Sequence, residues 1–135
     1  MSVCYIAGNK ILDYHFGLVD VAPPDPYYVG LSTTAILIDG TGKTEPTGGA
    51  YARVAIANNK TTFTAASSGS LTNAIEIAFV ESTGSWGTIT HVFLADAVSG
   101  GNIYFFEELP ASKIVQDDTI VKFAAAAMTF SMNNT

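Results

Sequence analysis

The stretch Trp86-Gly87-Thr88-Ile89-Thr90-His91-Val92-Phe93-Leu94-Ala95 decides the fold class, because β-branched and aromatic residues fill most of it. Both of its faces are mostly apolar, which is typical of a strand that is buried on both sides. Ser99-Gly100-Gly101-Asn102 follows as a hairpin-type turn, and Ile103–Leu109 is a second extended run that ends before Pro110. The sequence therefore predicts a buried strand followed by a hairpin.

Shorter strand signals lie on both sides of this hairpin, and turn-forming residues separate them, most densely at residues 39–49. The segments that predict strands are Tyr27–Leu31, Tyr51–Ala57, Thr61–Thr64, Ile75–Phe79, Ile120–Phe123 and Met128–Met132. Seven or eight short strands at regular spacing predict an all-β fold, an antiparallel β-sandwich or jelly roll.

The chain divides into an N-terminal arm with a Pro-rich linker at residues 1–26 and a β-sandwich body at residues 27–135. Pro23, Pro24 and Pro26 fix the backbone repeatedly and favour an extended path. We therefore expect this linker to hold the arm and the body apart without packing against either.

Within the arm, residues 9–17 predict a two-turn helix, with Asn9 as its N-cap and Gly17 in the left-handed position at its end. A helix this short is not stable alone in water, so it must dock on its own body or on another subunit. Residues 1–7 suit an extended strand that adds to another subunit's sheet. The arm residues expected to contact a capsid or a second subunit are Val3, Tyr5, Ile6, Ile11, Leu12 and Phe16.

The chain has few charged residues, and most of them are acidic. Charged residues make up 13% of the sequence, against roughly 25% in ordinary soluble domains, and the net charge is −6. A surface so poor in charge is buried against neighbours at little desolvation cost, which favours a homo-oligomer over a monomeric Thr-rich sandwich. The six Lys and Arg residues are scattered, and this argues against nucleic acid and anionic membranes as partners.

The residues that carry enzyme or metal chemistry form no recognisable pattern. The only histidines are His15 in the arm and His91 in the long strand, where a packed side chain is the favoured interpretation. The single cysteine, Cys4, is expected to be a buried apolar side chain, and the Asp39–Gly42 segment to be a turn rather than a calcium loop. We expect no catalytic residues, cofactor or metal site.

Targeting signals are also absent from the sequence. The first residues lack the basic start and apolar run of a secretory signal, and no stretch reaches the ~20 apolar residues of a membrane span. The protein is therefore expected to be made in the host cytoplasm and to stay soluble until it assembles.

Aromatic residues are the one feature that suggests ligand binding. They are typical of sugar-stacking platforms, but in a sandwich of this size most are expected in the core or an interface. The candidates are Tyr27, Tyr28, Tyr51, Trp86, Tyr104, Phe105 and Phe106.

An ordered series of segments resembles a family of small tailed-phage virion proteins. The segments that carry the resemblance are 11–17, 28–34, 45–54, 84–91, 96–102 and 123–125. Members of that family are described both as tail-fibre proteins and as head decoration or cement proteins. The resemblance implies a virion structural component, and it supplies no catalytic residue.

The resemblance and the composition together favour a capsid decoration (cement) protein on the outer surface of the virion. Its expected partners are the major capsid protein and further copies of itself, in a homotrimer whose arms clamp neighbouring capsid subunits. The alternative is a phage tail component, either a fibre-tip adaptor or a receptor-binding module. A carbohydrate-binding β-sandwich is the third interpretation.

Overall fold

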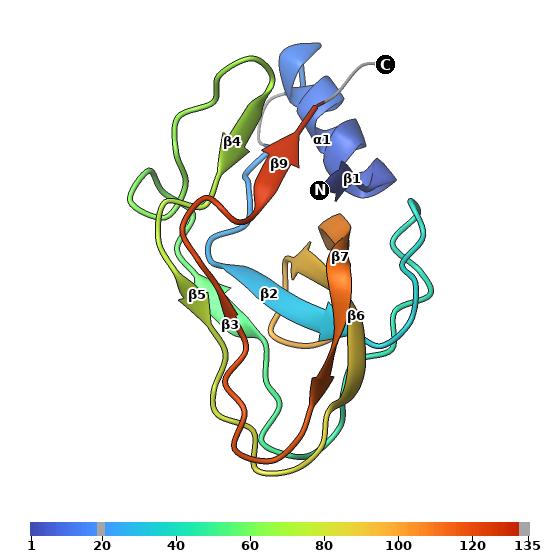
Figure 1. Ribbon diagram of the computed structural model, residues 1–135. Helices are drawn as coiled ribbons and strands as arrows, with labels where there is room; N and C mark the ends of the chain where they lie inside the picture. Colours follow the sequence, from blue (N-terminus) through green and yellow to red (C-terminus); the bar gives the residue numbers. More distant parts are fainter. Residues whose placement is uncertain (19–20, 133–135) are drawn as a thin grey trace.

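The computed structural model describes residues 1–18 and 21–132, and most of its regular structure is antiparallel β-sheet (Figure 1). The main sheet has five strands in the order β1-β7-β6-β2-β3. Their bounds are β1 Ser2–Val3, β2 Tyr27–Ser32, β3 Val54–Ile56, β6 Gly87–Ala95 and β7 Ile103–Val115. The remaining elements are β4 Ser70–Thr72 paired with β9 Thr129–Ser131, β5 Ile77–Ala78 paired with β8 Lys122–Phe123, and the helix α1 Tyr5–His15.

The prediction of antiparallel β-structure with a short N-terminal helix is confirmed, whereas a closed sandwich or jelly roll of seven or eight strands is not shown. The second layer consists of two two-stranded sheets instead of one continuous sheet. One reason why the second layer is not a continuous sheet is that the buried Asn73 side chain binds the backbone directly. The Asn73 amide donates to the carbonyls of Ile75 and Ala124 and accepts from the Met128 amide, at 2.8–2.9 Å. These contacts replace strand pairing in that layer.

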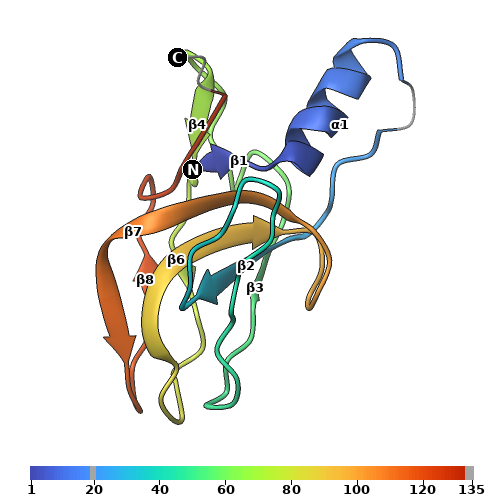
Figure 2. The same cartoon turned by 90° about the vertical axis from the view of Figure 1, so that its right-hand side faces the viewer.

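Strand β6 is the centre of the main sheet, as the sequence predicts. It pairs with β2 on one side and with β7 on the other, and its residues from His91 to Ala95 are all buried. The expected end of the second strand at Pro110 is wrong, because β7 continues to Val115. Residues 109–112 stand opposite Thr90 alone in a large bulge, where a proline's missing N–H costs no ladder bond. Figure 2 shows the strong curvature of both strands.

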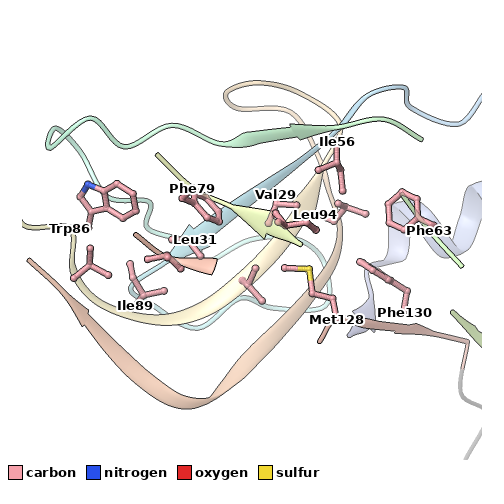
Figure 3. Close-up of a cluster of buried hydrophobic side chains, with 14 residues drawn as sticks. Val29, Leu31, Ile56, Phe63, Phe79, Trp86, Ile89, Leu94, Met128 and Phe130 are labelled. Atoms are coloured by element: carbon pink, nitrogen blue, oxygen red, sulfur yellow. The ribbon is translucent and has the colours of Figure 1, made fainter. Parts of the chain in front are cut away.

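The larger hydrophobic core lies between the main sheet and the small sheets (Figure 3). Trp86 stands at one end of this cluster, in edge-to-face contact with Tyr51 and Phe79, and its indole N–H donates to the Gly49 carbonyl at 2.8 Å. Phe63 and Phe130 stand at the other end. A smaller cluster covers the opposite face of the sheet, and it consists of Cys4, Ile36, Phe93, Ala95 and Ile103.

Arg53 and Glu45 form an ion pair in which the Arg53 side chain is buried, and Arg53 also joins the long 33–53 segment to the β6–β7 turn. The Arg53 guanidinium, 1% exposed, makes two hydrogen bonds to the Glu45 carboxylate at 2.8 and 2.9 Å. It also donates to the carbonyls of Ala97 and Gly100, and it lies over the Phe93 ring. Burial raises the pKa of Glu45, but hydrogen bonds from Arg53 and Tyr51 outweigh this and hold its pKa below the ordinary value.

Substitution by alanine is expected to change the free energy of unfolding in opposite directions at Gly30 and Gly8. A Cβ at Gly30 would stand 2.2 Å from the Phe93 ring, whereas one at Gly8 would meet nothing within 4 Å. Gly30→Ala should lower the free energy of unfolding by about 1–3 kcal/mol through overpacking. Gly8→Ala should raise it by about 0.5–1 kcal/mol, because alanine favours the helix. Urea unfolding of dilute protein measures both, and equal effects would contradict the packing described for the sheet.

Breaking the Glu45–Arg53 pair is expected to give a pH-dependent loss of stability. Glu45→Gln leaves a buried guanidinium without its counter-charge and should cost about 2–3 kcal/mol at pH 7. Because the folded-state pKa of Glu45 lies below its ordinary 4.5, this stabilisation is present above pH 4.5 and is lost as the pH falls through the folded value. The difference between variant and wild type should therefore shrink in acid. Glu76→Gln, at an exposed carboxylate, is the control, and a difference that is independent of pH would contradict the assignment.

Candidate functional site

The first residues of the chain are fixed on the main sheet and start the helix. Strand β1 pairs with β7, and the Cys4 and Tyr5 amides donate to the carbonyls of Tyr104 and Ile38 at 2.8 and 3.0 Å. The helix therefore begins at Tyr5, with Cys4 at the N-cap position and no side-chain cap. The prediction of a helix over 9–17 is correct for residues 9–15 and for the positive φ of Gly17, but its start and its Asn9 cap are wrong, because tertiary contacts and not a local cap set the start.

The expectation of an extended strand over residues 1–7 is correct only in small part. Ser2 and Val3 are extended, but they pair with Phe106 and Phe105 of the same chain, and residues 5–7 are already helical. The pairing therefore docks the arm on its own body in this structure.

The outward face of α1 carries an apolar stripe, with the exposed Asn9 and Asp13 along one side of it. Tyr5, Leu12 and Phe16 are 60%, 56% and 82% exposed, and Phe16 directly follows the last helical residue. At 3.6 residues per turn these side chains fall within about 40° of one another, with Gly8 beside them. We call Tyr5, Gly8, Leu12 and Phe16 the outer stripe. Exposed apolar side chains gathered in one strip mark an interaction surface more often than scattered ones do.

The inward face of α1 contacts the body. Ala7 is buried, Ile6 packs against the smaller core cluster, and Ile11 lines a groove between the helix and the sheet. The Lys10 ammonium donates to the Tyr104 hydroxyl at 2.7 Å, and this hydrogen bond raises the pKa of Lys10. The helix therefore has two faces, because Ile11 and His15 line the groove while Leu12 and Phe16 point away from it.

The six predicted contact residues of the arm differ in their exposure to solvent. Tyr5, Leu12 and Phe16 are available to a partner, whereas Val3, Ile6 and Ile11 are at least partly covered by the chain itself. Contact of any of them with another subunit stays a prediction.

The Pro-rich linker is not a free spacer. Pro23 and Pro24 line the groove beside α1, and Pro26 is half-buried. The Asn58 side chain donates to the Pro24 carbonyl at 2.8 Å, and its backbone amide donates to the Asp25 carboxylate at 3.0 Å. The division of the chain at residues 26 and 27 stays a prediction, but the linker packs on the body.

The side chains that could act in catalysis or bind a metal ion are dispersed over the structure. Within residues 1–18 and 21–132, no three His, Cys, Asp or Glu side chains come together in a way that would hold a metal ion. His91 is buried with its Nδ1 atom 2.8 Å from the Thr90 hydroxyl, which confirms the packed interpretation. The Asp39 carboxylate accepts hydrogen bonds from the Thr41 hydroxyl and amide, which lower its pKa and close the predicted turn. No helix in the described ranges is long and apolar enough to cross a membrane.

The aromatic residues do not form one exposed platform. Trp86 and Tyr51 belong to the core, while Phe106 lies beside a different surface hollow. Tyr27 of β2 and the consecutive residues Tyr104 and Phe105 of β7 meet at the groove beside α1. Sequence reasoning missed this meeting, since only the order of the strands in the sheet brings Tyr27 close to the two β7 residues.

The buried thiol of Cys4 offers a test of whether the arm is docked in solution. Burial, with a smaller effect from the Asp39 charge, raises the pKa of Cys4 from 9.0 to about 11. The thiolate is the reactive form, so alkylation by iodoacetamide at pH 8 should be about 100-fold slower in native protein than in urea. Equal rates in the two conditions would show that the arm leaves the body.

Comparison with protein-family models shows which family the chain belongs to. The model of a family described as Podophage GP4 fiber I protein gp80 matches residues 2–131, which is nearly the whole chain. No curated protein matches the chain. The family description names a fibre, so it supports the tail interpretation better than the capsid decoration role that was expected first. It also indicates a structural role rather than an enzymatic one. The chain belongs to the podophage GP4 fiber I protein gp80 family, and it is a tail-fibre component of a tailed-phage virion.

Proposed function

We propose that this protein is a short structural module of the fibre, an adaptor or receptor-binding unit, in which copies of the chain join through the outer stripe of α1. The exposed, uncharged stripe on a helix that is otherwise fixed to the body carries this proposal. The family match supports the fibre location.

The stripe has the composition of an interface centre. Aromatic residues are enriched and charged residues depleted in such centres, and the stripe has two aromatic side chains and no charge. A fully buried aromatic side chain covers about 150–250 Å². Burying Tyr5, Leu12 and Phe16 would therefore supply roughly half of the ~800 Å² per partner of a standard interface.

Further apolar surface continues beside the start of the stripe. Leu37 and Ile38 are 56% and 47% exposed in the turn whose carbonyl binds the Tyr5 amide. This turn and the stripe thus offer a continuous surface large enough for a stable contact. A second copy fits it, because an uncharged apolar surface is complementary to itself in a symmetric interface.

The trimer expected from the sequence stays a prediction, and the major capsid protein is not a partner in this proposal. The rest of the β body lies outside this contact and stays available to other partners. No cofactor or catalytic step is required, since the role is to hold a position in the fibre.

Polar substitution of the stripe should dissociate the assembly without unfolding the chain. Leu12→Ser with Phe16→Ser removes two exposed side chains, and Val98→Ser, at a 65% exposed position in the β6–β7 turn, is the matched control. Loss of about 3 kcal/mol of apolar burial should weaken self-association about 100-fold. Sedimentation measures association, and the thermal unfolding of dilute protein should change little. Wild-type protein that is monomeric at high concentration, or a double variant that associates as well as wild type, would contradict the proposal.

A further inference from the structure

Two hollows on the body adjoin each other, and we call them together the groove. The hollow beside α1 has a volume of about 330 Å³, and a second, between β2 and the Asn58–Lys60 turn, has about 380 Å³. Tyr27 and Phe105 line both of them. The volume of each lies in the range of small-molecule sites, about 300–1,000 Å³.

Aromatic rings form the floor of this groove and hold one another in place. Tyr27 makes edge-to-face contacts with Tyr104 and Phe63, with ring centroids 5.8 and 6.3 Å apart. Phe130 makes such contacts with Phe63 and Phe105 at 5.6 and 5.5 Å. Rings fixed in this way offer apolar faces without loss of side-chain freedom on binding.

The residues that line the groove differ in charge from the protein as a whole. The chain has 12 Asp and Glu residues against six Lys and Arg, yet no carboxylate is among the described residues that line either hollow. The nearby acids are Asp25, which accepts from the Asn58 amide, and Asp96, whose charge acts on Lys10 and Tyr27. Lys10 lines one hollow and Lys60 lines the other. An anionic ligand is therefore favoured here over a cationic one.

The Asn58–Lys60 turn supplies hydrogen-bonding groups to the groove. The Asn59 carboxamide oxygen accepts from the Thr61 and Thr62 amides, which orients the side chain. The Lys60 ammonium donates to the Thr64 carbonyl at 2.9 Å and retains further protons. An amide and an ammonium beside aromatic faces suit a ligand that has apolar faces and hydroxyl groups together.

A peptide strand is disfavoured in this groove because the backbone of its floor is already paired. Tyr27 lies on β2, which has β3 and β6 as neighbours, and Phe105 pairs with both Val3 and Leu94. Peptides that bind by adding a strand need a free sheet edge. Recognition here must therefore come from side chains alone.

We propose that this groove binds an acidic oligosaccharide. Its sugar rings pack on Tyr27 and Phe105, its carboxylates face Lys10 and Lys60, and its hydroxyl groups bond to the Asn58–Lys60 turn. The inference rests on the proposed function, since it names the ligand class of a receptor-binding unit in the fibre.

The test is a titration of the 135-residue chain, followed by NMR of its aromatic and backbone signals. A tetrasaccharide of galacturonic acid and sialyllactose are the acidic probes, maltotetraose is the neutral one, and hexaglutamate is the acidic peptide. The acidic saccharides should shift Tyr27 and Phe105 saturably. Lys10→Gln with Lys60→Gln should weaken their binding about tenfold and leave maltotetraose unchanged. Lys113→Gln, an exposed lysine on β7, should have no effect.

Absence of groove shifts with every saccharide, or shifts that the double lysine variant does not reduce, would overturn the proposal. Tighter binding of hexaglutamate at the same residues would reassign the groove to an acidic peptide. Incorporation of the wild-type protein into virions is measured in parallel. Wild-type protein that enters the fibre but binds no saccharide contradicts only the ligand, whereas wild-type protein absent from the fibre contradicts the proposed function.

Discussion

The buried Arg53 guanidinium is the contact on which the arrangement of the longest loops depends. It joins Glu45, two carbonyls of the β6–β7 turn and the Phe93 ring, which otherwise lie on separate segments. Tyr51 extends the network to β2, since its hydroxyl binds both Glu45 and the Leu31 amide. A guanidinium shielded from water is tolerated only with such complete pairing, so the 33–53 loop has little freedom to move.

The fixed loop determines what remains available to partners. Phe93, held beneath Arg53, is part of the cluster in which Cys4 is buried, and Cys4 sets the first turn of α1. The helix is consequently anchored at its start, with one face on the body and the other in solvent. The same anchoring creates the groove between α1 and β2. The assembly surface and the ligand groove proposed here thus lie on opposite faces of one helix.

Local sequence patterns predicted the features that depend on neighbours along the chain. The buried strand β6, the β6–β7 hairpin, the buried Cys4 and the packed His91 all follow from the apolar pattern around them. The helix start did not, because hydrogen bonds from the Cys4 and Tyr5 amides to the Tyr104 and Ile38 carbonyls replace a cap. The continuation of β7 through Pro110 and the aromatic groove depend on pairing between distant segments, which periodicity does not reveal. The exposed Leu12 and Phe16 were foreseen as contacts, but the division of the helix into two faces was not.

Location and number of copies in the particle test the fibre assignment most directly. Mass spectrometry of purified virions, with the major capsid protein as the internal standard, gives the copy number, and gold-labelled antibody gives the position. The account predicts a few to a few dozen copies per particle, with label at the tail and not distributed over the head. A copy number in simple proportion to the capsid protein, with label over the whole shell, would contradict it and restore the decoration role.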